Sequence, residues 1–277
     1  ALDTYQTDPE RCGPPYYPLD LSILLLPYAG WTKWLLGHPD QALDRCTTAI
    51  ARAKQHNQRL ELAYANVLTA FVYYLRREPD QIRLHATSGG VLAEQYGYDV
   101  LAASTVIFGN WVEFMAQPQP GLLERIQQGL TAWQSSGARM QVSSFLVMLA
   151  EAQARCGQPA AGLATLERAL AHLTTHGEGF FKAEVYRLQG ELHRTMQDEV
   201  TAEACFQQAL AVAQAQQSRM LALRAATSLA RLWQQQGRTA AAYPLLAEIY
   251  EHFNEGFTTL DLQLARALLA ELAEQAY

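Results

Sequence analysis

The chain has 277 residues, of which 49% are hydrophobic and 17% charged, so it is long and apolar enough to bury a sizeable core. Its formal net charge of −6 argues against a protein that follows the phosphate backbone of a nucleic acid. The four cysteines (Cys12, Cys46, Cys156 and Cys205) form no C-x-x-C pair, which argues against a zinc ribbon or a thioredoxin motif and favours reduced thiols in a cytoplasmic protein.

The N-terminal part of the chain contains two stretches that bear on targeting and membrane insertion. Its first ten residues, ALDTYQTDPE, are polar and lack the basic start and apolar run of a signal peptide, so we expect none. The segment 21–37, LSILLLPYAGWTKWLLG, is the one membrane-like stretch. It contains Pro27 and Lys33, and it is shorter than the about 20 residues that a spanning helix needs. We therefore predict a buried helix here and no association with a membrane.

The sequence repeats with a period of 40 residues. Three columns taken at this period contain only apolar residues or glycine, and they are offset by four and then three residues, which places them on one face of a helix. The first column is Ala42, Ile82, Leu122, Gly162, Ala202 and Ala242. The second is Cys46, Ala86, Ile126, Leu166, Phe206 and Leu246, and the third is Ala49, Gly89, Gly129, Ala169, Ala209 and Ile249.

Two further columns define a second helix and a turn in each unit. A column of mostly small residues, which lets two helices approach closely, is Gly30, Ala70, Asn110, Ala150, Gly190 and Ala230. A turn column follows it: Gly37, Arg77, Gln117, Gly157, Gln197 and Gly237. Pro39, Pro79 and Pro159 come two residues after this turn, where proline suits the first turn of a helix. Each unit is therefore a helix, a short turn and a second helix.

The predicted fold is all-α, a right-handed α-solenoid of six such repeats in a single domain spanning 1–277. The predicted helices are 18–36, 39–55, 59–76, 79–95, 99–116, 119–135, 140–156, 159–174, 180–196, 199–215, 218–236 and 239–253. The corresponding repeats are about 18–58, 59–98, 99–138, 139–178, 179–218 and 219–256. A last helix near 258–274 has no partner, so we expect it to cap the final repeat.

The small residues at these offsets resemble the tetratricopeptide repeat, a helix–turn–helix unit. The unit here is 40 residues long and not 34, with the extra length between repeats. The tyrosine of that family late in the first helix is mostly replaced, by Lys33, Glu113, Gln153 and His193. The resemblance implies that the first helix of each pair lines a concave surface.

Longer stretches resemble the C-terminal repeat region of large bacterial signalling proteins. They include LLGHPDQAL, AEVYRLQGEL, AEACFQQALAVAQAQQS, LRAATSLARLWQQQGR and LLAEIYEHFNEGFTTLDLQLARALLAEL. In that family the repeats follow a STAND-type ATPase module, often with a class III adenylate or guanylate cyclase or a transcription-factor domain. This chain contains no G-x-x-x-x-G-K-[ST] motif. The resemblance therefore implies a sensor and scaffold portion, excised or standing alone, that acts with an NTPase or cyclase.

Charged residues are predicted on the concave side of the C-terminal half. Glu184, Arg187 and Glu191 lie on one helical face because they are three and four residues apart. The resemblance places them, with Arg194, in the groove, and the matching positions of neighbouring repeats are Glu151, Arg155, Arg224 and Arg231. They are either salt bridges between repeats, each worth about 0–1 kcal/mol if exposed, or a polar anchor for a peptide or an anionic small molecule. In the second case Arg187 would hold a carboxylate or phosphate.

The same columns are aromatic in the N-terminal half: Trp31, Phe71 and Trp111, then Trp34, Tyr74 and Phe114. Aromatic stripes at helical spacing are usually core, whereas aromatics that line an open groove would form a binding site. A pocket of this kind could hold an apolar ligand, a partner helix or a flat ring. The sequence leaves both interpretations open.

No arrangement of residues indicates catalysis, a metal or a cofactor. His172 and His176 lie near Glu178, but no third ligand recurs at a fixed spacing, and there is no G-x-S-x-G elbow. We expect a non-catalytic interaction or sensor scaffold that binds a partner segment or small effector in its groove and regulates an attached or partner NTPase or cyclase. A purely structural oligomerisation module is the alternative.

Overall fold

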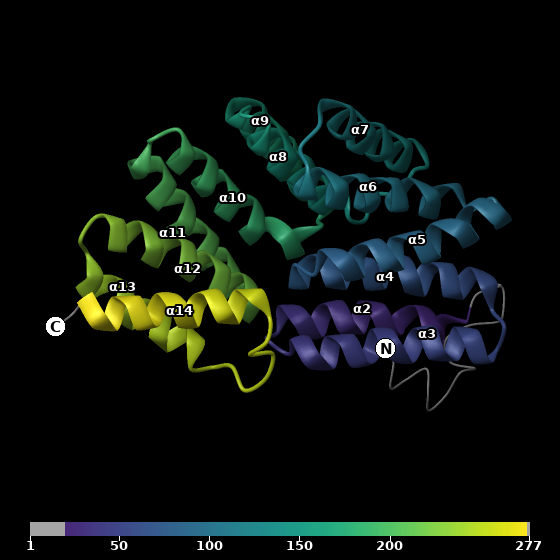
Figure 1. Cartoon of the computed structure of the whole chain (residues 1–277), viewed down its shortest axis with the longest axis horizontal. Coiled ribbons are helices and arrows are strands. Elements are labelled where there is room, and N and C mark those ends of the chain that lie inside the picture. Colours follow the sequence, from purple (N-terminus) through teal and green to yellow (C-terminus); the bar gives the residue numbers. More distant parts are fainter. Residues whose placement is uncertain (1–19, 276–277) are drawn as a thin grey trace.

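The computed structural model describes residues 20–275, which form helices joined by short turns (Figure 1). The helices are α2 (Leu21–Leu35), α3 (Pro39–Gln55), α4 (Arg59–Arg76), α5 (Pro79–Tyr96), α6 (Asp99–Ala116), α7 (Pro120–Ser135), α8 (Val142–Arg155), α9 (Pro159–His176), α10 (Lys182–Thr195), α11 (Glu199–Ala215), α12 (Arg219–Gln235), α13 (Thr239–Tyr250) and α14 (Leu260–Gln275). A short 3-10 helix, η2 (Gly179–Phe181), precedes α10. The predicted all-α solenoid is confirmed, since this part of the chain contains no strand.

Successive helices pack as pairs, from α2 with α3 to α12 with α13, and each pair packs on the next. The last helix, α14, packs against α12 and α13 with Leu262, Ala265, Leu268 and Leu272 buried. No helix of the region 20–275 is long and apolar enough to cross a membrane. The apolar segment after residue 20 instead forms α2, whose Ile23 side chain is fully buried.

The turns explain how the 40-residue period produces regular helix pairs. Within pairs, the left-handed residues are Gly37, Arg77, Gly157, Gln197 and Gly237, which belong to the predicted turn column. A second left-handed column, which the sequence had not revealed, lies between pairs: Asn57, Gly97, Gly137, Gly177 and Gln217. Both columns end a helix by reversing the sign of φ, as C-terminal caps commonly do.

Glycines on the packing faces mark where two helices of a pair approach most closely. A Cβ atom at Gly190 would lie 2.5 Å from the ring of Phe206, and one at Gly30 would lie 2.6 Å from the carbonyl oxygen of Ala42. Gly89 packs in the same way against Val67. Gly129 packs likewise against Ile107, so packing requires these two glycines of second helices although glycine lowers helix propensity.

The ends of the solenoid meet, so the helix pairs form a closed ring (Figure 1). The carboxylate of Glu255 accepts hydrogen bonds from the backbone N–H groups of Asp40 and Gln41 at 3.0 and 3.2 Å, at the N-terminus of α3. The N–H of Gly256 donates to Asp40 at 2.9 Å, and its Cα packs against Pro39. Residues more than two hundred positions apart in sequence are thereby joined.

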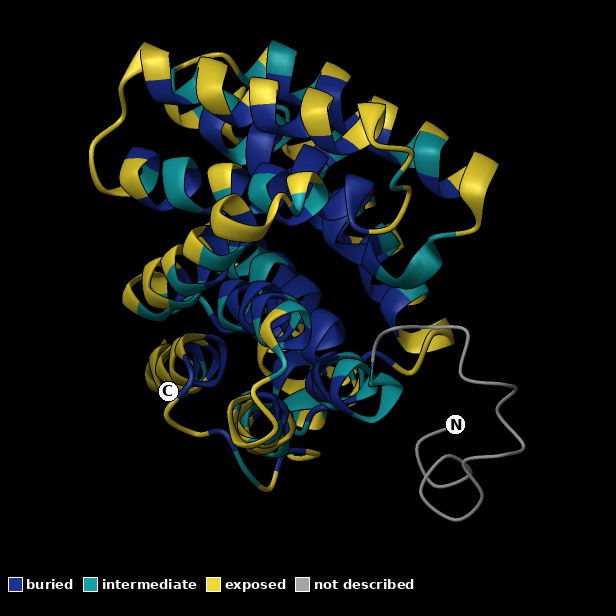
Figure 2. Ribbon diagram, turned by 90° about the vertical axis from the view of Figure 1, so that its right-hand side faces the viewer, coloured by how far each residue is buried: buried dark blue, intermediate teal, exposed yellow. Residues whose placement is uncertain are grey.

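The aromatic columns lie inside this ring, where their side chains are buried as core, although Tyr74 and Trp111 also reach a pocket. Phe180 and Phe181 of η2 pack against these aromatic columns. The ring centroid of Phe180 lies 4.4 Å from that of Trp31, and the two rings are edge-on. The six predicted side chains are all at most 9% exposed: Trp31, Trp34, Phe71, Tyr74, Trp111 and Phe114. Figure 2 shows the buried residues on the inner faces of the helices and the exposed residues outside.

Candidate functional site

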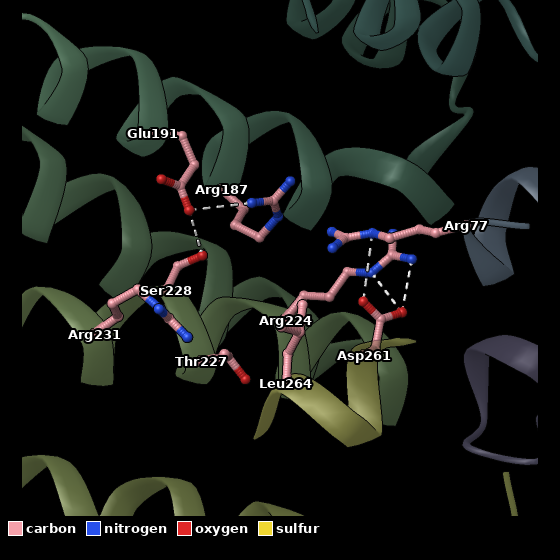
Figure 3. Close-up of a pocket in the computed structure, with 9 residues that line it drawn as sticks. All are labelled: Arg77, Arg187, Glu191, Arg224, Thr227, Ser228, Arg231, Asp261 and Leu264. Atoms are coloured by element: carbon pink, nitrogen blue, oxygen red, sulfur yellow. Dashed lines mark hydrogen bonds and ion pairs between the residues drawn. The ribbon is translucent and has the colours of Figure 1, made fainter. Parts of the chain in front are cut away.

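Two adjoining pockets lie inside the ring and share Arg77, Glu191 and Arg224. The larger, of about 540 Å³, is called the aromatic pocket because Tyr74 and Trp111 form part of its wall. The smaller, of about 310 Å³, is called the arginine pocket (Figure 3). Its lining residues are Arg77, Arg187, Glu191, Arg224, Thr227, Ser228, Arg231, Asp261 and Leu264.

The ladder on α10 forms one side of both pockets. Arg187 donates two hydrogen bonds to the carboxylate of Glu184, at 2.9 and 2.8 Å, and a third to Glu191 at 3.3 Å. Glu184 is 2% exposed. Burial by itself would raise the pKa of Glu184, but the positive charges of Arg187 and Arg224 outweigh it and hold the pKa at about 2. This carboxylate is therefore ionised under all physiological conditions.

Arg224 on α12 connects the two ends of the ring. It donates to Asp261 of α14 at 3.0 and 2.8 Å and to the carbonyl oxygen of Leu75 at the end of α4. Its guanidinium also lies 4.8 Å from the ring centre of Trp34 in α2, a cation–π geometry. One buried side chain thus fixes α2, α4, α12 and α14 relative to one another.

Asp261, at the start of α14, is a buried carboxylate that pairs with two arginines. Its side chain is 4% exposed and binds Arg224, and the Nε atom of Arg77 lies 3.4 Å from its other oxygen. Burial works against ionisation, but Arg224 and Arg77 lower the pKa of this carboxyl. Arg77 itself occupies a left-handed turn between α4 and α5, which directs it into the arginine pocket.

Glu151 on α8 differs from the other three carboxylates of the site. Its Oε2 atom is buried and has no hydrogen-bond partner among the described residues. Burial, together with the negative charge of Glu184, raises the pKa of Glu151 to about 7, although Arg187, Arg77 and Arg224 act in the opposite direction. The indole Nε1 of Trp111, in the wall of the same pocket, also lacks a partner within residues 20–275.

The structure brings most of the predicted polar residues together. The predicted groove residues that line the two pockets are Tyr74, Trp111, Glu151, Arg155, Glu184, Arg187, Glu191, Arg224 and Arg231. Trp31, Trp34, Phe71 and Phe114 do not reach either pocket, because neighbouring side chains cover them. The sequence missed Arg77 and Asp261, whose turn and helix-start positions carried no signal that they would meet.

The histidine pair lies at the junction of α9 with η2. His172 is 3.5 Å from Glu178, and the Glu178 carboxylate accepts hydrogen bonds from the backbone of Gln141 and the hydroxyl of Ser143. No group of three or more metal-ligating side chains lies close enough to hold an ion in the part of the chain that the structure describes. These contacts tie the segment after α9 to the start of α8 within one repeat.

Comparison with solved structures identifies the architecture. A Rap protein complexed with competence and sporulation factor is 13% identical over 99% of this chain and 80% of its own, with a TM-score of 0.63. A STAND protein with a tetratricopeptide repeat sensor from Pyrococcus horikoshii is 13% identical over 92% of this chain and 38% of its own, with a TM-score of 0.54. This fold is a tetratricopeptide-like solenoid.

Aspartyl phosphate phosphatase F from Bacillus subtilis has the same tetratricopeptide-like fold. It is 11% identical over 99% of this chain and 74% of its own, with a TM-score of 0.52. No protein-family model matches the sequence, and no curated protein matches it. At these identities the likeness establishes the fold alone, so the function has to be argued from the pockets.

Proposed function

We propose that this chain is a regulatory interaction scaffold that binds a partner segment or a small effector inside its ring. The observation that carries the proposal is the aromatic pocket of about 540 Å³, in which two buried polar groups, Glu151 Oε2 and Trp111 Nε1, have no partner among the described residues. Buried polar groups are nearly always hydrogen-bonded, so an unmet donor and an unmet acceptor in one pocket favour a ligand there.

Each part of the site would have its own role. Tyr74 and Trp111 form an apolar wall, and the Glu184–Arg187–Glu191 ladder with Arg231 forms a polar anchor. The similar Rap protein was solved with competence and sporulation factor bound, which supports a binding role for a solenoid of this shape. We further propose that the regulated partner is an NTPase or cyclase, supported by the STAND protein whose sensor has the same fold.

The regulation would follow from the position of the pockets between the two ends of the ring. The aromatic pocket is lined by residues of α4, α5, α6, α8, α10, α12 and α14. A ligand that contacts several repeats stabilises one curvature of the solenoid over another, because a ligand shifts a conformational equilibrium by its difference in affinity for the two states. A partner that senses this curvature would respond to the ligand.

A thermal-shift screen of short peptides, nucleotides, sugars and organic acids tests the proposal. Ala154 lines the aromatic pocket, so Ala154→Phe fills it without removing a polar group. Ala241→Phe, at an exposed position on α13, is the matched control. We expect at least one ligand that raises the Tm of the wild type and of the control but not of Ala154→Phe. A ligand that stabilises all three proteins equally would contradict binding in the ring.

A structural oligomerisation module is the second candidate. Leu84 and Val91 lie seven residues apart on α5 and are 55% and 59% exposed, which favours a contact between chains on the outside of the ring. This function predicts dimers whose fraction rises with concentration in light scattering, and Leu84→Gln would abolish them. A monomer at all concentrations would contradict it.

A further inference from the structure

The interior of the ring carries an excess of positive charge although the chain as a whole has a net charge of −6. Five arginines line the two pockets: Arg77, Arg155, Arg187, Arg224 and Arg231. Four carboxylates face them: Glu151, Glu184, Glu191 and Asp261. The lining charge is therefore 5 − 4 = +1 when all four are ionised, and +2 when Glu151 carries its proton.

The carboxylates other than Glu151 are already occupied by their own partners. Glu184 is held by Arg187, Asp261 is held by Arg224, and Glu191 accepts from Arg187, Arg194 and the hydroxyl of Ser228. The carboxylates of Glu184, Glu191 and Asp261 are therefore already hydrogen-bonded within the fold. Among the described residues, these contacts leave Arg155 and Arg231 without a carboxylate and Arg77 with a single contact, to Asp261.

Two arginines of the arginine pocket keep unused donors. Arg231 forms no hydrogen bond or ion pair with any described residue, and Arg77 engages Asp261 through its Nε atom alone. Figure 3 shows the side chains of Arg77, Arg187 and Arg231 around the arginine pocket. Like charges that converge on a partly buried space are unfavourable unless an opposite charge lies between them.

The unpartnered polar groups of the adjoining aromatic pocket indicate whether a ligand would be an anion or a cation. Trp111 is 9% exposed and offers an N–H donor without an acceptor within residues 20–275. Because burial raises the pKa of Glu151 to about 7, this carboxyl can carry a proton at neutral pH and then also donates. A cationic ligand would add to the excess of positive charge, whereas an anion would neutralise it and accept from every free donor.

We propose that the arginine pocket binds the carboxylate or phosphate group of a small ligand whose body extends into the aromatic pocket, held by the unused donors of Arg77 and Arg231. This inference rests on the proposed function, because it names the chemistry of the ligand that the ring takes up. The guanidinium forks match the oxygens of such anions geometrically, and the partial burial of the pocket strengthens each charge-assisted hydrogen bond.

Titration of the full chain with two simple anions tests this inference, with sulfate standing for a phosphate group and succinate for a carboxylate. Ionic strength is kept constant with sodium chloride so that general screening does not contribute. We expect saturable binding of at least one of them by calorimetry, and the stronger one indicates the natural group. Absence of saturable binding of both anions overturns the proposal.

The variant Arg231→Gln is suited to this test because the side chain of Arg231 lines the pocket and forms no hydrogen bond or ion pair with any described residue. We expect it to weaken binding of the anion about tenfold, the cost of removing one charge-assisted contact. The control is Arg83→Gln, an exposed arginine on the outer helix α5, which we expect to bind as the wild type does. Equal weakening by both variants would show a general charge effect and would overturn the assignment to this pocket.

Proton uptake provides a second readout that a structural role of Arg231 would not produce. Glu151 faces Tyr74 of α4, Arg77 of the following turn, Glu184 and Arg187 of α10, and Arg224 of α12. An anion placed among these groups favours the protonated form of Glu151, so sulfate affinity is expected to fall as the pH rises from 6 to 8. In Glu151→Gln this dependence disappears. Affinity that increases with pH would overturn the role of Glu151.

The anion subsite and the proposed function can fail independently. Ala154 lines the aromatic pocket and does not line the arginine pocket. If sulfate or succinate binds the wild type and Ala154→Phe equally while no larger ligand binds, the subsite stands and the proposed function fails. If a larger ligand binds the wild type and Arg231→Gln equally well, the proposed function stands and the subsite fails.

Discussion

At the scale of single residues, two carboxylates inside the ring have opposite titration behaviour. Glu184 is held ionised by two arginines, whereas burial raises the pKa of Glu151, which has no partner for one oxygen. The difference arises from hydrogen-bond geometry, because Glu184 lies three residues before Arg187 on the same helix and Glu151 lies on another. A neutral and a charged carboxyl are thereby kept side by side.

Glu151 is expected to destabilise the protein at high pH. Its pKa is about 7 in the folded state against 4.5 for an ordinary glutamate, so the folded state binds more protons between these values. The corresponding stability is fully present below pH 4.5 and is lost as the pH rises through 7. Glu151→Gln should therefore be more stable than the wild type at pH 8, by about 1–3 kcal/mol, and similar at pH 5. Urea unfolding at the two pH values measures this, and an equal effect at both would contradict it.

Glu184 gives the opposite dependence, because its folded-state pKa of about 2 lies below the ordinary 4.5. Its contribution is present above pH 4.5 and is lost as the pH falls towards 2. Arg187→Met would leave Glu184 buried with one partner fewer, and we expect a loss of about 3–5 kcal/mol at pH 7. Arg194→Met, which breaks a more exposed pair with Glu191, should cost about 0–1 kcal/mol. Equal losses in urea unfolding would contradict the burial of the ladder.

At the scale of helices, small residues set the distance between the two members of a pair. Gly190 lies against the ring of Phe206, and Gly30 against the backbone of α3. The columns that the sequence showed at these positions are therefore contacts between helices, which explains why they recur with the period of the repeat. The turn columns have the same origin in the geometry of one repeat.

Two glycines in first helices provide a matched comparison. Gly190→Ala would place a Cβ atom 2.5 Å from Phe206, so we expect a loss of about 1–3 kcal/mol from overpacking. At Gly109 in α6, the Cβ atom that alanine adds would meet no other atom within 4 Å, so Gly109→Ala should stabilise by up to about 1 kcal/mol through helix propensity. Thermal unfolding measures both. Destabilisation of similar size by the two substitutions would contradict close packing at Gly190.

At the scale of the whole molecule, the decisive feature is the contact between the first and last repeats. Glu255 accepts from the N-terminus of α3, where the helix dipole favours a negative charge, and Arg224 reaches the end of α4. These contacts close the ring, complete both pockets and bury the aromatic columns. The binding site and the closure of the fold are therefore one structure.

Glu255→Ala is expected to loosen this closure. It removes three hydrogen bonds, from the backbone of Asp40 and from the backbone and side chain of Gln41. We expect a larger radius of gyration in X-ray scattering and stronger acrylamide quenching of the tryptophans, because the interior becomes accessible. Glu251→Ala, an exposed residue of the same segment, is the control. Unchanged scattering and quenching in Glu255→Ala would show that the ring closes without this contact.

The sequence alone predicted the helices, their pairing and the residues that could line the inside of the solenoid. Those features depend on spacings of three, four and forty residues, which a linear pattern records directly. It also placed Glu184, Arg187 and Glu191 on one face, and the pockets include all three. Only the tertiary structure decided that the ring closes, that Phe180 and Phe181 fill the aromatic face, and that Arg77 meets Asp261. The physical reason is that closure is the sum of small rotations between successive helix pairs, so contacts between residues far apart in sequence leave no local pattern.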